Sequence, residues 1–147
     1  MAVAMAARAL TIGTLAERTG CTVPTIRYYE DIGLLPPPRR GAGGQRSYAE
    51  GDFARLTFIR RCRDFDFPIE QIRELVALVE NPERDCVAAK DLAEIHLSAV
   101  RAKLRELRAL EKSLSQFATA CAAQCAGGPT RDCVILDEFS KPAKCGC

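Results

Sequence analysis

The chain has 147 residues, of which 48% are hydrophobic and 27% are charged, and its net charge is +2. This length allows one domain, or a small domain with an appendage, and the composition is typical of a soluble globular protein. So small a net charge indicates no particular partner. Because no apolar run approaches the roughly 20 residues that cross a bilayer, and the first residues are too weakly apolar for a secretory signal, we expect a cytoplasmic protein with no membrane partner.

Two short helices joined by a tight turn are predicted near the start of the chain. The first covers residues 11–19, with Thr11 as its N-cap and Gly20 as its stop. The second begins after Thr22, which can cap it, and ends at Gly33. Two helices of this kind indicate a helix-turn-helix.

The second helix carries the side chains best placed to reach DNA. Recognition helices read base edges and phosphates from their N-terminal end, where Thr25, Arg27 and Tyr28 lie. The guanidinium of Arg27 can fork to a guanine edge or to a phosphate. We expect Tyr29 in the core and Glu30 in a salt bridge rather than on a base.

A loop or small β wing is predicted over residues 34–48. Three prolines and three glycines there exclude a helix, and the segment carries Arg39, Arg46 and Tyr48. Residues 39–63 hold seven arginines. Such a patch suits a polyanion, although from charge alone a solvated basic face explains it equally well.

Two further helices follow, over residues 50–65 and from Pro68 to about residue 80. Their apolar residues recur at helical spacing and are expected to face inward. These residues are Phe53, Leu56, Phe58 and Ile59 in the first helix, and Ile69, Ile72, Leu75, Val76 and Val79 in the second.

A long helix is predicted from about Cys86 to Cys121, because this segment contains no glycine and no proline. Its apolar residues recur at spacings of three and four, as in a coiled coil. They are Leu97, Val100, Leu104, Leu107, Leu110, Leu114 and Phe117. A chain this short has little else to cover such a stripe, so we expect a homodimer, with packing onto residues 50–80 of the same chain as the alternative.

Four stretches follow one another along the chain: TIRYYE, GLLPP, QRSY and RLTFIRRCRDFDFPIEQIRELV. In these motifs and their order, residues 10–140 resemble the MerR family of bacterial transcription regulators. The resemblance implies a mainly α fold. It would consist of a winged helix-turn-helix over residues 10–80, a long antiparallel coiled-coil dimerisation helix over 84–121, and a C-terminal cysteine-rich metal-binding loop with a short helix over 121–147.

The resemblance also implies a function, which is gene regulation rather than enzymatic catalysis. A homodimer would bind promoter DNA, with RNA polymerase at the same promoter, and would activate transcription by distorting the operator when its effector binds. By resemblance, the residues that contact DNA are Arg27, Tyr28, Arg46 and Tyr48, with Arg39 and Arg60 on phosphates.

Cysteines are the candidate effector site. Eight of them in a reducing compartment favour metal or redox chemistry over disulfides. In an antiparallel pair of long helices, Cys86 of one protomer can approach Cys121 and Cys133 of its mate, and three thiolates make a soft-metal site. The divalent-sensing branch of the family carries a cysteine at the position of Cys86, which implies lead, cadmium, zinc or mercury as the ligand.

The chain has further cysteines and a single histidine, some of which are candidate metal ligands. Additional ligands could come from Cys125, Cys145, Cys147 or His96. Cys21 and Cys62 are expected to be small buried residues rather than ligands.

Several alternatives stay open at this point. The spacing within CAGGPTRDC is close to that of loops for monovalent copper, silver or gold. An iron–sulfur redox sensor needs a tighter cysteine cluster, and a small-molecule sensor needs an added domain. From another class, a thiol enzyme or metal-delivery protein lacks a CxxC motif and a histidine partner other than His96. DNA binding by the metal-free protein separates the regulator from the last class.

Overall fold

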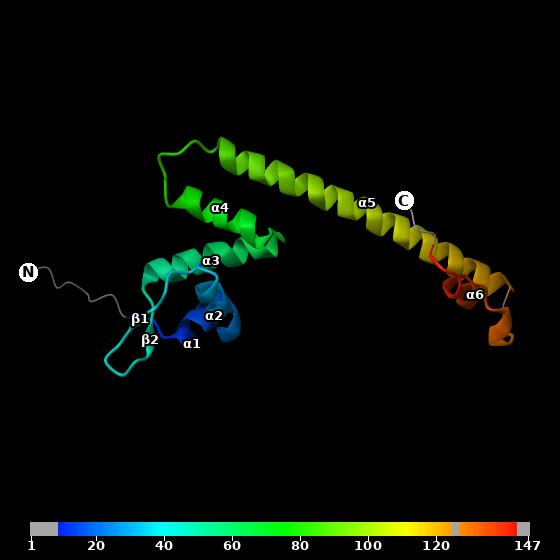
Figure 1. The fold of residues 1–147 in the computed structure, drawn as a ribbon, viewed down its shortest axis with the longest axis horizontal. Helices are drawn as coiled ribbons and strands as arrows, with labels where there is room; N and C mark the ends of the chain where they lie inside the picture. The colour runs from blue at the N-terminus through cyan, green and yellow to red at the C-terminus, as the bar shows by residue number, and fades with distance from the viewer. Residues whose placement is uncertain (1–8, 125–126, 144–147) are drawn as a thin grey trace, which may run out of the picture. The chain divides into compact units, whose positions relative to one another are not determined.

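The computed structural model describes residues 9–124 and 127–143. Its elements are α1 (Ile12–Thr19), α2 (Val23–Asp31), β1 (Arg39–Arg40), β2 (Arg46–Ser47), α3 (Glu50–Asp64), α4 (Ile69–Val79), α5 (Val87–Gln124), a short 3₁₀ turn η1 (Thr130–Asp132) and α6 (Val134–Ser140) (Figure 1). The chain divides into two compact units at residues 93 and 94, which lie within α5. None of the helices in the described ranges is long and apolar enough to cross a membrane.

The starts and stops predicted for α1 and α2 are confirmed. The hydroxyl oxygen of Thr11 accepts a hydrogen bond from the amide three residues on at 3.1 Å, and that of Thr22 does the same at 3.2 Å. Each bond satisfies an amide that has no partner inside its helix. Gly20 follows α1 with φ of 69°, and Gly33 follows α2 with φ of 70°, in the left-handed region that glycine adopts without strain.

The predicted wing is a two-stranded antiparallel sheet in which Arg39 pairs with Ser47 and Arg40 pairs with Arg46. It is joined to the start of the chain by Leu10 and Tyr48. The amide of Leu10 donates to the carbonyl of Tyr48 at 2.8 Å, and the amide of Tyr48 donates back at 2.9 Å. This exchange fixes the base of the wing beside the beginning of α1.

The core of the first unit lies between the helix-turn-helix and the two helices after the wing. α1 packs against α2 and α3, and α3 packs against α4 (Figure 1). The largest fully buried side chains are Leu15, Ile26, Leu34, Leu35, Tyr48, Leu56, Ile59 and Ile72. Burying each aliphatic chain contributes about 1.5–3 kcal/mol, so these contacts are the main favourable term in folding this unit.

Most residues predicted to face inward from α3 and α4 do so. Val76 is buried with Leu56, Ile59 and Ile72, and the partly buried members of the set are Phe53, Phe58, Ile69 and Leu75. The prediction for Val79 is wrong, since its side chain is 61% exposed. Val79 is the last residue of α4 and borders two open surface pockets instead of the core.

The second unit contains most of α5, which has 38 residues in all and confirms the predicted long helix. The stripe of leucines and Val100 on this helix stays exposed, at fractions between 44% for Leu104 and 55% for Leu107. At the other end of this unit, the ring of Phe117 meets the ring of Phe139 from α6 edge to face, with 5.8 Å between centroids. The apolar seam of α5 therefore has no cover along most of its length in the described chain.

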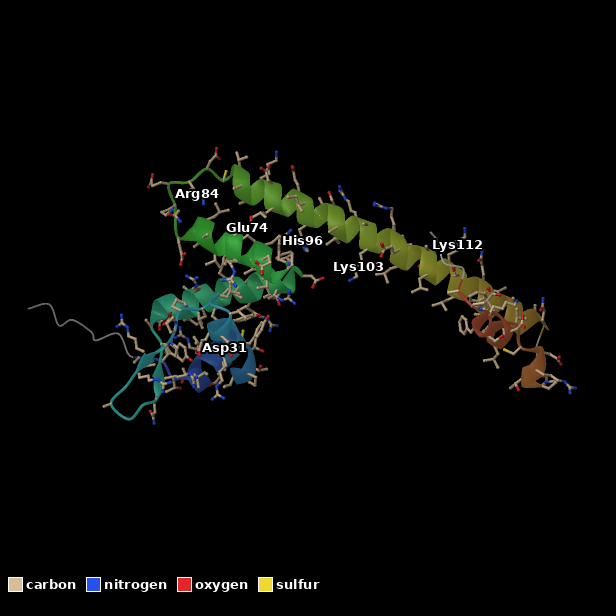
Figure 2. The ribbon with its side chains drawn as sticks, in the orientation of Figure 1. Asp31, Glu74, Arg84, His96, Lys103 and Lys112 are labelled. Carbon is tan, nitrogen blue, oxygen red and sulfur yellow. The ribbon has the colours of Figure 1, made fainter. Side chains whose placement is uncertain are left out.

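We expect Ile72→Ala to lower the free energy of unfolding by about 2–5 kcal/mol, because it removes fully buried methyl and methylene groups from the core. The matched control is Glu74→Ala on the same helix, whose exposed side chain is labelled in Figure 2 and whose loss should cost no more than about 0.5 kcal/mol. Urea unfolding at one fixed protein concentration measures both. Equal effects of the two substitutions would contradict this placement of the core.

Candidate functional site

The side chains predicted to contact DNA come from α2 and from the wing. On α2, Arg27 is exposed and Tyr28 is 50% exposed. Thr25 is half-buried, and its hydroxyl lies 2.7 Å from the hydroxyl of Thr22. On the wing, Arg39 is exposed. Arg27, Tyr28 and Arg39 are therefore accessible to a large ligand, while Thr25 also stabilises the start of its helix.

A cleft of about 390 Å³ lies where the start of α1, the helix α2 and the wing meet. It is lined by Thr11, Ile12, Arg27, Gly44, Gln45 and Arg46. Arg27 and Arg46 thus border one hollow beside the N-terminal turn of α1. Two positive charges and the positive end of a helix dipole favour an anion of the phosphate type.

Tyr48 is a correction to the predicted set of DNA contacts. Its side chain is only 1% exposed, and its hydroxyl donates a short hydrogen bond to the Glu30 carboxylate. Burial raises the pKa of Tyr48 far above its ordinary value, and the hydrogen bond to Glu30 raises it further. A ring so enclosed offers DNA almost no surface to contact. Tyr48 is therefore reassigned from DNA contact to the core.

The salt bridge expected for Glu30 is confirmed. Its second carboxylate oxygen lies 3.4 Å from Nε of Arg46, and the Glu30 side chain is only 7% exposed. One carboxylate thus contacts both Tyr48 and Arg46, which joins the recognition helix to the wing.

Part of the arginine patch has structural partners. Arg60, a predicted phosphate contact, donates from Nε to Asp64 at 3.1 Å and from Nη1 to the carbonyl of Gly20 at 3.2 Å. Its side chain is still 48% exposed, so a phosphate can approach it. Outside the patch, Arg18 of α1 donates to both oxygens of Glu50, at 2.9 and 3.4 Å.

Two further arginines stabilise the turn after α2, a role that the sequence pattern did not reveal. Arg55 donates from Nε to the carbonyl of Leu34 at 2.8 Å, and Arg73 donates to the carbonyl of Ile32 at 2.8 Å. The partners lie 21 and 41 residues away along the chain, so local periodicity holds no signal for them. Both side chains satisfy backbone carbonyls in the turn that follows α2.

The cysteines divide into buried and accessible groups. Cys21 and Cys62 are 7% and 8% exposed, which confirms that they are core residues, and burial raises the pKa of the Cys62 thiol. Cys86 is exposed immediately before α5 and lines an apolar pocket of about 300 Å³. Cys121 near the end of α5 and Cys133 just before α6 are half-buried.

The structure places Cys86 in the first unit and the other two predicted ligands, Cys121 and Cys133, in the second. Within the residues that the structure describes, no group of three or more histidine, cysteine or acidic side chains is gathered closely enough to hold a metal ion. His96 is half-buried on α5 (Figure 2). The possible additional ligands Cys125, Cys145 and Cys147 lie outside the described residues.

Two family models match the chain. One is described as "MerR HTH family regulatory protein" and matches residues 10–78, and the other as "MerR, DNA binding" and matches residues 53–117. The first match covers the helix-turn-helix, the wing, α3 and nearly all of α4. The second extends from α3 into α5.

Curated proteins and solved structures resemble the chain over most of its length. The HTH-type transcriptional regulator HmrR of Rhizobium leguminosarum bv. viciae is 40% identical over 91% of this chain and all of that protein. Heavy metal-dependent transcription regulator 2 of Rhizobium meliloti is 33% identical over 89% of this chain and 86% of that protein. The crystal structure of PbrR691 from Ralstonia metallidurans CH34 in complex with lead(II) matches with a TM-score of 0.77 and 40% identity, over 89% of this chain and 99% of that one.

Proposed function

Because the chain belongs to the MerR family of helix-turn-helix regulatory proteins, we propose that it is a metal-responsive activator of metal-resistance or efflux genes. Two copies bind promoter DNA in the cytoplasm with their winged heads, at a site that RNA polymerase also occupies. A divalent soft metal ion, which is lead, cadmium, zinc or mercury, is the effector. Cys86 of one copy and Cys121 and Cys133 of the other are its ligands.

The DNA-binding part of the proposal rests on the accessible charges of the first unit. Arg27 and Arg46 border one cleft, and Arg39 and Tyr28 are exposed on the wing and on the recognition helix. Contacts to phosphates fix the position of a protein on the duplex, and a recognition helix reads bases from its N-terminal end, where Arg27 lies.

The dimer is proposed from the exposed seam of α5. Leu97, Val100, Leu104, Leu107, Leu110 and Leu114 are each between 44% and 55% exposed. A stripe of this length left in water is unfavourable, and a second α5 with the same spacing covers it by coiled-coil packing. A closed two-fold pair is the most common way in which identical chains bury such a surface.

The length of α5 carries the assignment of the metal ligands. Cys86 directly precedes this helix and Cys121 lies close to its end. A helix of this length lies between the two cysteines along the chain, so we assign them to one ion as ligands from two copies rather than from one. In an antiparallel pair of α5 helices, the start of one helix lies beside the end of the other. The pair has two such junctions, and the three ligands meet at each of them.

The chemistry of the donors supports a soft metal ion. Thiolates bind lead, cadmium, zinc and mercury well, and a bound cation holds its ligands deprotonated. Among the relatives, PbrR691 is in complex with lead(II), and the Rhizobium meliloti protein is named as heavy metal-dependent. We extend that chemistry to this chain and assign Cys86, Cys121 and Cys133 as the ligands.

The proposed positions of the ligands explain how metal binding changes the activity of the promoter. Thiols from both copies meet at each end of the α5 pair, so ligation stabilises one arrangement of the dimer over another. The heads then hold the operator in a different bend and twist without leaving it, which changes promoter geometry for RNA polymerase.

We expect Cys86→Ser to abolish activation by divalent ions while the metal-free protein still binds its operator, because a serine hydroxyl is a poor ligand for soft ions. The test is in vitro transcription from the promoter upstream of the protein's own gene, with lead, cadmium, zinc, mercury, copper(I), silver and gold. Cys62→Ala, which removes a buried thiol of the core, is the control and should keep the response. Full activation of Cys86→Ser by the inducing divalent ion would contradict the assignment.

We expect Leu104→Asp to convert the dimer to monomers at micromolar concentration, because it places a charge in the middle of the apolar seam. Lys103→Asp introduces the same residue at the neighbouring position, labelled in Figure 2, and should leave the dimer intact. Sedimentation velocity separates the two species. A dimer that survives Leu104→Asp would show that another surface joins the chains.

A further inference from the structure

The carboxylate of Glu30 occupies an unusual position for an acidic group on a DNA-binding surface. It lies on α2, the recognition helix, three residues after Arg27 and next to the cleft that Arg27 and Arg46 border. A negative charge there repels the phosphates that this face is built to attract. Its nearly complete burial, at 7% exposure, adds the cost of removing a charge from water.

The contacts of Glu30 show what offsets that cost. One carboxylate oxygen accepts the hydrogen bond from the Tyr48 hydroxyl, and the other lies 3.4 Å from Nε of Arg46. Nε of Arg46 is itself buried and has no hydrogen-bond partner within bonding geometry. The ion pair with Glu30 is therefore the interaction that compensates this buried end of the guanidinium.

Tyr48 ties the carboxylate to the base of the wing. Its ring is in the core, and its backbone exchanges two hydrogen bonds with Leu10 at the start of α1. Glu30 thus contacts a fixed hydroxyl on one side and a wing arginine on the other. Since the wing sheet has only two residues in each strand, few contacts of its own hold Arg46 in place.

We propose that Glu30 is a positioning residue for DNA binding, which holds the guanidinium of Arg46 beside Arg27 so that their shared cleft receives one backbone phosphate. The inference rests on the proposed DNA-binding function and names one contact within it. Preorganisation of this kind raises affinity, because the arginine loses less side-chain freedom when the phosphate arrives.

Two possible roles of Glu30, as a repelling charge or as a positioning group for Arg46, predict opposite effects of Glu30→Gln on DNA affinity. If Glu30 acts only through its charge, removing a negative group beside the cleft strengthens DNA binding. If it positions Arg46, the same change weakens binding, because the neutral amide no longer pairs with the guanidinium. We expect about a tenfold loss of affinity for a duplex of the promoter upstream of the protein's own gene, measured by fluorescence anisotropy with full-length protein.

Two further readouts separate positioning from a general effect on the fold. The slope of log affinity against log salt should become shallower by about one in Glu30→Gln and in Arg46→Ala alike, as for the loss of one phosphate contact. Adding Glu30→Gln to Arg46→Ala should cause no further loss, since the positioned group is already gone. Asp31→Asn, an equal charge change at the exposed end of α2 (Figure 2), should bind as tightly as the wild type or more tightly.

Tyr48→Phe provides an independent variant if Glu30→Gln proves unstable in a thermal melt. It keeps the buried ring and every charge but removes the hydroxyl that holds Glu30, so we expect roughly a threefold loss that also disappears in the Arg46→Ala background. Unchanged or tighter binding by Glu30→Gln, or losses that add to that of Arg46→Ala, would overturn the inference. A wild-type protein that binds no promoter duplex would instead overturn the proposed function.

Discussion

The length of α5 is the constraint from which the proposed dimer follows. α5 has 38 residues, with Cys86 just before its start and Cys121 near its end. We propose that an ion held by Cys86 and Cys121 joins two chains rather than two parts of one chain. A second chain would bury the exposed seam of leucines along the same helix. The seam and the proposed ligands therefore imply the same dimer.

The arginines of the first unit include some that hydrogen-bond within the fold and some that are exposed to solvent. Arg55 and Arg73 satisfy backbone carbonyls after α2, and thereby fix the end of the recognition helix. Arg27 and Arg39 extend from this fixed frame toward solvent. Arg46 belongs to both groups, because one end of its guanidinium is buried against Glu30 while its side chain lines the cleft.

Local signals in the sequence predict the helices and the wing. They do not predict contacts between residues that are far apart along the chain. Thr11 and Thr22 as caps, with Gly20 and Gly33 as stops, located both helices of the helix-turn-helix, because capping depends on residues only a few positions apart. The buried position of Tyr48 depended on Glu30 from another element, and the motif around it was equally compatible with an outward ring. The proposed roles of Cys86, Cys121 and Cys133 depend on a second chain, which no pattern within one chain can place.

The most direct test of this account is the metal stoichiometry of a mixed dimer. One chain would carry Cys86→Ser and the other Cys121→Ser with Cys133→Ser, so that only one of the two junctions keeps all three thiols. Titration with cadmium(II), followed by thiolate charge-transfer absorbance, should give half the wild-type stoichiometry for the mixed dimer and no tight binding for either variant alone. Wild-type stoichiometry in the Cys86→Ser homodimer would contradict a site shared between two chains.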